Sequence, residues 1–113
     1  MKTAGVGFLV KKLTRLQRTY RYYNRRYFNG ELPPLSEVTI KWEDTGPMLM
    51  GYQDEDKIAI SKTYRSSSTV WKLTLLHEMQ HLAMRDKDVP AHGKEFQAGM
   101  MRLAKLGAFK KLW

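Results

Sequence analysis

All three histidines of the chain lie within residues 75–96, which read LLHEMQHLAMRDKDVPAHGKEF. His77 and His81 are four residues apart, Glu78 follows the first of them, and His92 comes eleven residues after the second. On a helix, positions i and i+4 lie one turn apart on the same face, roughly 6 Å from each other. Two imidazoles at this spacing can bind one metal ion.

A catalytic zinc site commonly has three protein ligands and one open position, so the two helical histidines need a third partner. We expect His92 to be that ligand, because residues 86–91 form a loop that turns the chain back and His92 opens the next helix. Glu95 and Asp88 are the alternatives. The expected cofactor is one zinc ion. In the alternative interpretation, no metal is bound, and the two helical histidines face solvent or form ordinary hydrogen bonds.

Glu78 is rotated by about 100° from His77 on a helix, so it flanks the expected metal rather than binding it. Zinc lowers the pKa of a water that it binds to about 7, and a carboxylate in this position can take the proton of that water. The pattern therefore predicts a zinc metalloprotease with Glu78 as catalytic base. Tyr52, Tyr64 and Arg65 are candidates for stabilising the oxyanion or binding substrate, although ordinary packing is the plainer role for each tyrosine.

The elements that must position these residues follow from apolar periodicity. A stripe at helical spacing predicts a first helix from about residue 7 to residue 28. Its members are Leu9, Leu13, Leu16, Tyr20, Tyr23 and Tyr27. Helices are also expected over residues 65–85, capped by Ser67 or Ser68, and over residues 93–107, ended by Gly107. The tail residues Phe109, Leu112 and Trp113 are expected to pack onto the core.

Three short runs with strand character lie between the first two helices, at residues 37–43, 48–53 and 57–63. Their short connections predict a three-stranded antiparallel meander. Gly51 within the second run indicates a bulge or a close backbone approach. The whole chain, residues 1–113, is thus expected to form one α+β domain, a minimal zincin-like metalloprotease.

Charge is distributed unevenly along the chain, whose net charge is +9. Residues 1–30 contain eight basic residues and no acidic one. Such a segment is suited to binding a polyanion, and we expect DNA, preferably single-stranded, as the partner. Because no groove-reading motif is present, this binding should be independent of DNA sequence. An acidic protein, a membrane surface or plain solvation are the alternatives. The candidate nucleic-acid-binding residues are Lys11, Lys12, Arg15, Arg18, Arg21, Arg25 and Arg26, and Tyr22 and Tyr23 are candidates for stacking on bases.

The cellular setting is indicated by three simple features. The chain has no cysteine, which excludes disulfides and cysteine zinc sites and fits a reducing compartment. Its apolar runs are too short to span a membrane. Lys11 and Lys12 interrupt the apolar N-terminal run, which is atypical of a signal peptide. We expect a cytoplasmic protein, with association to the nucleoid or other DNA following from the basic segment.

The order of several short motifs resembles the SprT-like zinc metallopeptidase family, the Spartan-type protease domain. The motifs are YFNGELPP (27–34), VTIKW (38–42), GY (51–52), IAIS (58–61), LLHEMQHLAM (75–84) and HGKEF (92–96). The resemblance implies that His77, His81 and His92 bind zinc, that Glu78 is the base, and that the substrates are proteins associated with or crosslinked to DNA. Many members carry a cysteine zinc ribbon after this domain; here DNA contacts are expected to come from elsewhere.

Two other functions compete with this expectation. One is a small cytosolic zinc peptidase with a dedicated protein target, such as a repressor. The other is a non-catalytic nucleic-acid-binding module whose metal is structural. The second is disfavoured because structural zinc sites are closed by four ligands, and this pattern supplies three histidines and an adjacent glutamate.

Overall fold

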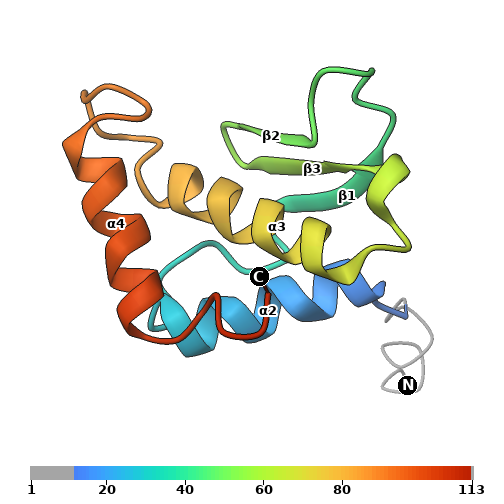
Figure 1. Cartoon of the computed structure of the whole chain (residues 1–113), viewed down its shortest axis with the longest axis horizontal. Helices are drawn as coiled ribbons and strands as arrows, with labels where there is room; N and C mark the ends of the chain where they lie inside the picture. Colours follow the sequence, from blue (N-terminus) through green and yellow to red (C-terminus); the bar gives the residue numbers. More distant parts are fainter. Residues whose placement is uncertain (1–11, 113) are drawn as a thin grey trace, which may run out of the picture.

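A computed structural model describes residues 12–112 of the chain. The described part is an α+β fold of three α-helices and a three-stranded mixed sheet (Figure 1). In chain order, the elements are α2 (Arg15–Tyr27), β1 (Thr39–Glu43), β2 (Gly51–Asp54), β3 (Lys57–Ser61), the 3₁₀ turn η1 (Lys62–Tyr64), α3 (Ser68–Ala83) and α4 (Lys94–Lys105).

The sheet has the strand order β1-β3-β2, so β3 is central and β2 lies at an edge. β2 pairs antiparallel with β3, but β1 runs parallel to β3, with Ile40 opposite Ile58. The expected all-antiparallel meander is therefore wrong for β1. The physical reason is that β3, whose Ile58, Ala59 and Ile60 are all fully buried, lies between β1 and β2 rather than at an edge of the sheet. The chain reverses direction from β1 to β2 and again from β2 to β3, so β3 runs in the same direction as β1 where the two strands pair.

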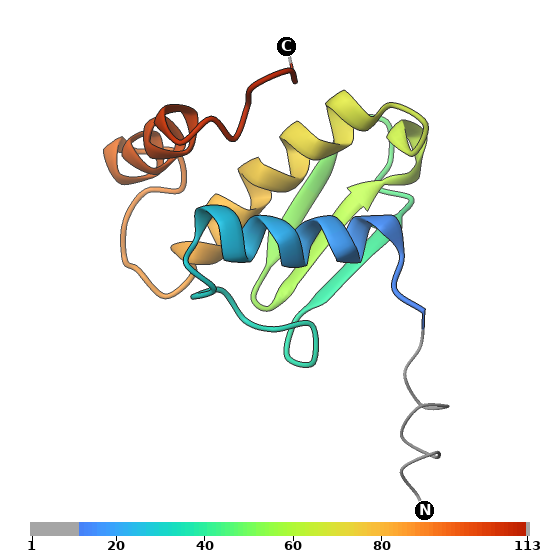
Figure 2. The same ribbon diagram turned by 90° about the horizontal axis from the view of Figure 1, so that it is seen from below.

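α2 and α3 lie on the same side of the sheet (Figures 1 and 2). α3 packs on β2 and β3, while α2 packs on β1. The core between them includes Leu16, Tyr20 and Leu75, each no more than 1% exposed. α4 follows the loop after α3 and packs against α3 rather than against the sheet (Figure 1).

α2 begins later than the sequence periodicity predicted. Residues 12–14 are not helical, and residues 7–11 lie outside the described part of the chain. The start is fixed by a capping box at Thr14, whose hydroxyl oxygen accepts a hydrogen bond from the Gln17 amide. The Gln17 side chain in turn accepts one from the Thr14 amide. Thr14-x-x-Gln17 satisfies two backbone donors at once, so the helix begins at Arg15.

The turn after α2 is held by two side chains of that helix. The buried Asn24 amide group donates to the carbonyl oxygen of Leu32 and accepts from the Leu32 amide, both at 3.0 Å. The Tyr20 hydroxyl donates to the carbonyl oxygen of Pro33 at 2.6 Å. These bonds return the chain across the end of α2 and lead it into β1.

The other expected elements are found close to their predicted positions. Ser67 is the N-cap residue of α3, although its side chain makes no capping hydrogen bond. α4 ends before Gly107, which adopts a φ of +83°. Phe109 is buried and Leu112 packs against the core, as predicted, while Trp113 lies outside the described residues. None of the described helices is both long and apolar enough to cross a membrane.

Candidate metal centre

Three imidazoles converge at the end of α3 that faces α4. His77 and His81 project from successive turns of α3, and His92 lies in the loop two residues before α4 begins. The His81 Nε2 atom is 3.2 Å from Nε2 of His77 and 3.1 Å from Nε2 of His92. One nitrogen from each ring lies within 4.8 Å of the other two.

This spacing fits a shared ion. Three nitrogens at ~2.0–2.1 Å from a tetrahedral zinc lie about 3.3–3.4 Å from one another, close to the two short separations here. A neutral imidazole has one N–H, so His81 Nε2 cannot donate to both neighbours, whereas a cation between the rings satisfies all three nitrogens. Among the described residues, His77, His81 and His92 form the group of metal-binding side chains whose ligand atoms lie close enough together to hold one ion.

The protonation of the histidines suits metal binding. Burial lowers the pKa of His81 to about 4, with a smaller contribution from His77 and His92. Burial also lowers the pKa of His77, assisted by the charge of His92. Both rings are therefore neutral near pH 7, which is the form that binds a metal ion.

The ring of Phe96 lies against all three imidazoles. It stacks on His81, with centroids 4.4 Å apart and planes inclined by 21°. It meets His77 and His92 edge-on, with centroids 5.0 Å away in each case. Phe96 is only 3% exposed, so this contact forms an apolar wall that restricts the rotation of the rings.

The position of Phe96 depends on a close approach of α4 to α3. A Cβ atom added at Gly99 would lie 2.2 Å from Nε2 of Gln80, whose side chain is buried. Gly99 is one turn after Phe96 on α4, and Gln80 precedes His81 on α3. The absence of a side chain at Gly99 thus lets the two helices approach each other next to the histidines.

Glu78 is 8% exposed and borders an open cleft of about 320 Å³. Burial raises the pKa of its carboxyl group to about 7. The cleft is lined by residues 48–51 on the β2 side and by Leu73, Thr74, His77 and Glu78 from α3. The predicted base and one predicted ligand therefore share a wall of the same cleft.

A second, more apolar cavity of about 370 Å³ lies on the α4 side of His77. His77 and Leu73 line both cavities, so they adjoin across this pair of residues. Its other lining residues include Met100, Met101 and Ala104 of α4, and Phe109. The metal centre is thus flanked by a cleft towards β2 and an apolar hollow towards α4.

Tyr52, Tyr64 and Arg65 do not line either cavity. The Tyr52 hydroxyl donates a short hydrogen bond to the Glu43 carboxylate on β1. The Arg65 guanidinium lies 5.4 Å from the centroid of the Trp42 ring. Tyr64, half-buried, ends the turn η1. Their participation in substrate or oxyanion binding stays a prediction.

The described candidate nucleic-acid-binding residues do not belong to the group of metal-binding histidines. Lys11 lies outside the described residues, and Lys12 is exposed ahead of α2. The five arginines are exposed on α2, where Arg15 and Arg18 also line a large cleft away from the histidines. These arginines are Arg15, Arg18, Arg21, Arg25 and Arg26.

A comparison with protein-family models gives one decisive result. The model of the SprT-like family matches residues 16–111. The chain belongs to the SprT-like family. A comparison with curated proteins found no match. SprT-like proteins are generally metallopeptidases, and the three converging imidazoles lie within the matched region.

Sequence reasoning missed two features of the SprT-like centre. The contact of Phe96 with all three imidazoles was not predicted. The place of Phe96 four residues after His92 put it within reach of that ring. The contact between Gly99 and Gln80 had no such sequence signal beyond a glycine inside a helix.

Proposed function

We propose that this SprT-like protein is a zinc-dependent endopeptidase with Glu78 as its catalytic base. The observation that supports this most strongly is the convergence of three Nε2 atoms beside a buried carboxylate in an open cleft. Three ligands leave the fourth position of a tetrahedral ion available to water and substrate, which distinguishes a catalytic from a structural site.

The chain's residues divide the chemistry between them. His77, His81 and His92 would hold the ion, which supplies Lewis acidity that polarises the scissile carbonyl and lowers the pKa of the attacking water. Glu78 accepts the proton of that water as it attacks the carbonyl carbon, and then donates the proton to the leaving amine. Phe96 keeps the three rings in position on the side away from the cleft and excludes water there.

The substrate is an extended peptide that binds along β2. β2 is an edge strand of the sheet, and its first residue, Gly51, lines the cleft together with residues 48–50 and Glu78. A peptide added as a further strand is held mainly through backbone hydrogen bonds, which impose little side-chain selectivity. The apolar hollow lined by Met100 and Met101 then accepts an apolar side chain on the far side of His77.

We further propose that the relevant substrates are proteins associated with or crosslinked to DNA, cleaved in the cytoplasm or on the nucleoid. The support is the charge of residues 1–30, which contain eight basic residues and no acidic one. Recruitment to a polyanion restrains a peptidase of low sequence selectivity, because cleavage is then confined to proteins held on the same molecule. A peptidase with a dedicated target, such as a repressor, is the second candidate.

The test compares wild type with Glu78→Gln on a fluorescently labelled unfolded protein. We expect Glu78→Gln to retain one zinc per chain and the same far-UV circular dichroism, but to lose cleavage by at least about 100-fold. Glu95→Gln, which removes a carboxylate from the first turn of α4, is the matched control and should remain active. Cleavage by zinc-loaded Glu78→Gln at the wild-type rate would refute the proposal.

A second comparison separates the two kinds of substrate. Adding single-stranded DNA should accelerate the cleavage of a DNA-bound protein, and raising the salt concentration should remove the acceleration. A peptidase with a dedicated target should cleave at a rate that is indifferent to DNA.

A further inference from the structure

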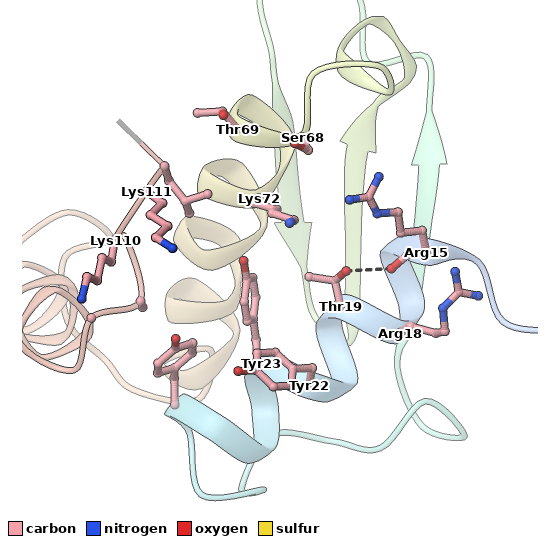
Figure 3. A pocket seen from close by; sticks show the side chains of 14 residues that line it. Arg15, Arg18, Thr19, Tyr22, Tyr23, Ser68, Thr69, Lys72, Lys110 and Lys111 are labelled. Atoms are coloured by element: carbon pink, nitrogen blue, oxygen red, sulfur yellow. Dashed lines mark hydrogen bonds between the residues drawn. The ribbon is translucent and has the colours of Figure 1, made fainter.

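A further cleft in the described structure lies away from the metal centre. It has a volume of about 620 Å³ and is bounded by α2, the first turns of α3 and the chain after α4 (Figure 3). We call it the basic cleft, because five of its lining residues are cationic and none of the described lining residues is acidic. The cationic residues are Arg15, Arg18, Lys72, Lys110 and Lys111.

The five cations come from three separate segments that folding brings together. Arg15 and Arg18 lie on α2, Lys72 on α3, and Lys110 and Lys111 on the returning tail (Figure 3). Like charges repel, so a fold that gathers them around one concave surface favours an anionic occupant.

Several of these side chains are already held in place. The Arg15 guanidinium and the Lys72 ammonium lie 5.6 and 5.7 Å from the ring centroid of Trp71. Arg18 donates a hydrogen bond of 2.6 Å to the carbonyl oxygen of Leu13. Contacts of this kind reduce the side-chain entropy that would be lost when an anion binds.

The start of α3 adds partial positive charge to the same cleft. Ser68 and Thr69, the first two residues of the helix, line the cleft. The N-cap residue Ser67 makes no side-chain capping bond to the first-turn amides. The first amides of a helix have no partner within it, and they are suited to phosphate oxygens.

Three tyrosines also line the cleft: Tyr22, Tyr23 and Tyr27. The ring of Tyr22 is 5.9 Å from that of Tyr23, and Tyr22 is 50% exposed. Aromatic rings beside a basic surface bind unpaired bases by stacking, whereas the bases of a duplex are already stacked on one another.

We propose that the basic cleft binds single-stranded nucleic acid, with its cations and the start of α3 on the phosphates and Tyr22 on a base. A flat anionic membrane would not reach the walls of a concave cleft, and an acidic peptide has no base to stack on Tyr22. The cleft is distinct from the metal centre. Ser68 in the cleft and His77 in the metal centre are nine residues apart on α3, which corresponds to about 13–14 Å along the helix axis. Binding here therefore depends neither on metal nor on the peptidase function.

The test measures the binding of fluorescent dT15 to the metal-free full chain by anisotropy at several salt concentrations. Each phosphate neutralised on a single strand contributes about −0.7 to the slope of log K against log salt concentration. Five contacts predict a slope of about −3.5. Lys72→Gln/Lys110→Gln should change it to about −2 and weaken binding about 25-fold at 0.1 M salt.

The matched control is Lys62→Gln/Lys105→Gln, which removes the same charge from exposed positions that neither line the cleft nor belong to the candidate nucleic-acid-binding residues of α2. It should leave the slope near that of wild type. Equal losses in the two double variants would overturn the proposal, because attraction would then be a property of overall charge rather than of the cleft.

Two further arms identify the ligand. Tyr22→Leu should weaken dT15 binding by at least about fivefold with an unchanged salt slope, since it removes stacking and no charge. Inorganic phosphate, duplex DNA, poly-glutamate and vesicles containing phosphatidylserine should each compete with dT15 at least tenfold less effectively than unlabelled dT15. A competitor from this set that matches dT15, or an unchanged affinity in Tyr22→Leu, would overturn the assignment to single strands.

Discussion

The ring of Phe96 stacks on the imidazole of His81, with ring centroids 4.4 Å apart and planes at 21°. His81 belongs to α3 and Phe96 to α4, so this contact joins the two helices at the metal centre. The same ring contacts His77 and His92. The geometry of the ligands is therefore fixed by packing as well as by their place in the sequence.

Replacing Phe96 by Leu should weaken zinc binding while the chain still folds. The leucine side chain keeps the site apolar but lacks the flat surface that restrains three imidazoles. Groups that orient metal ligands contribute about 10- to 100-fold to affinity, and we expect about tenfold here. The measurement is a competition titration with a chromophoric zinc chelator. Phe28→Leu, an equivalent change of a buried ring at the C-cap of α2, should leave the zinc affinity unchanged.

Replacing Gly99 by Ala should destabilise the protein, although alanine is the better helix former by about 1 kcal/mol. The added Cβ would lie 2.2 Å from Nε2 of Gln80, at the end of a flexible side chain that must move aside. Because Gln80 is buried, its amide group has little space to move, and we expect an overpacking cost of about 1–3 kcal/mol. Urea unfolding measures the change. Gln80→Ala in the same chain should relieve the clash, so the two substitutions should be non-additive. Additive effects would show that α4 does not depend on this contact.

Gly51→Ala should destabilise the fold and disturb the substrate cleft. A Cβ at this position would lie 2.7 Å from the carbonyl oxygen of Ala59 and 2.9 Å from Cγ2 of Thr74. The start of β2 must then move away from β3 and α3, at a cost of about 1–3 kcal/mol in the free energy of unfolding. Asp54→Ala, exposed at the other end of β2, is the control. A variant as stable as wild type would contradict this packing.

Acid should remove a stabilising contribution of Glu43. The hydroxyl of Tyr52 and then the ammonium of Lys57, 2.9 Å away, lower the pKa of Glu43 from 4.5 to about 2. Because the folded-state pKa is the lower one, the contribution is complete above pH 4.5 and is lost as the pH falls from about 4.5 to about 2.

The measurement for Glu43 is urea unfolding of wild type and Glu43→Gln in a metal chelator, at pH 6 and at pH 2.5. The stability difference between the two proteins should be largest at pH 6 and much smaller at pH 2.5. A difference independent of pH would show that the carboxylate's charge does not stabilise the fold.

Much of the fold and of the metal centre follows from local sequence patterns. The helical spacing of His77 and His81 required no tertiary information, and neither did the end of α4 at Gly107. The start of α2 could also have been predicted from the sequence, because Thr14 and Gln17 form a capping box. The apolar stripe extends further towards the N-terminus and therefore predicted an earlier start. Strand order was different: the short connections predicted an antiparallel meander, whereas the strand with Ile58, Ala59 and Ile60 fully buried is the central one.

The features that escaped prediction depend on contacts between distant segments. Parallel pairing of β1 with β3 depends on which partner covers the central strand, which no local pattern encodes. The contact of Gly99 with Gln80 joins two helices whose approach is set by the whole core. The basic cleft likewise joins Arg15 to Lys110, which are far apart in the sequence.

The most direct test of the metal centre is a zinc titration of the purified chain in competition with a chromophoric chelator, for wild type, His92→Ala and Glu95→Ala. Wild type and Glu95→Ala should each bind one zinc ion with the same affinity. His92→Ala should bind at least about 100-fold more weakly, because two imidazoles then remain. An unchanged affinity in His92→Ala would contradict a centre built from His77, His81 and His92.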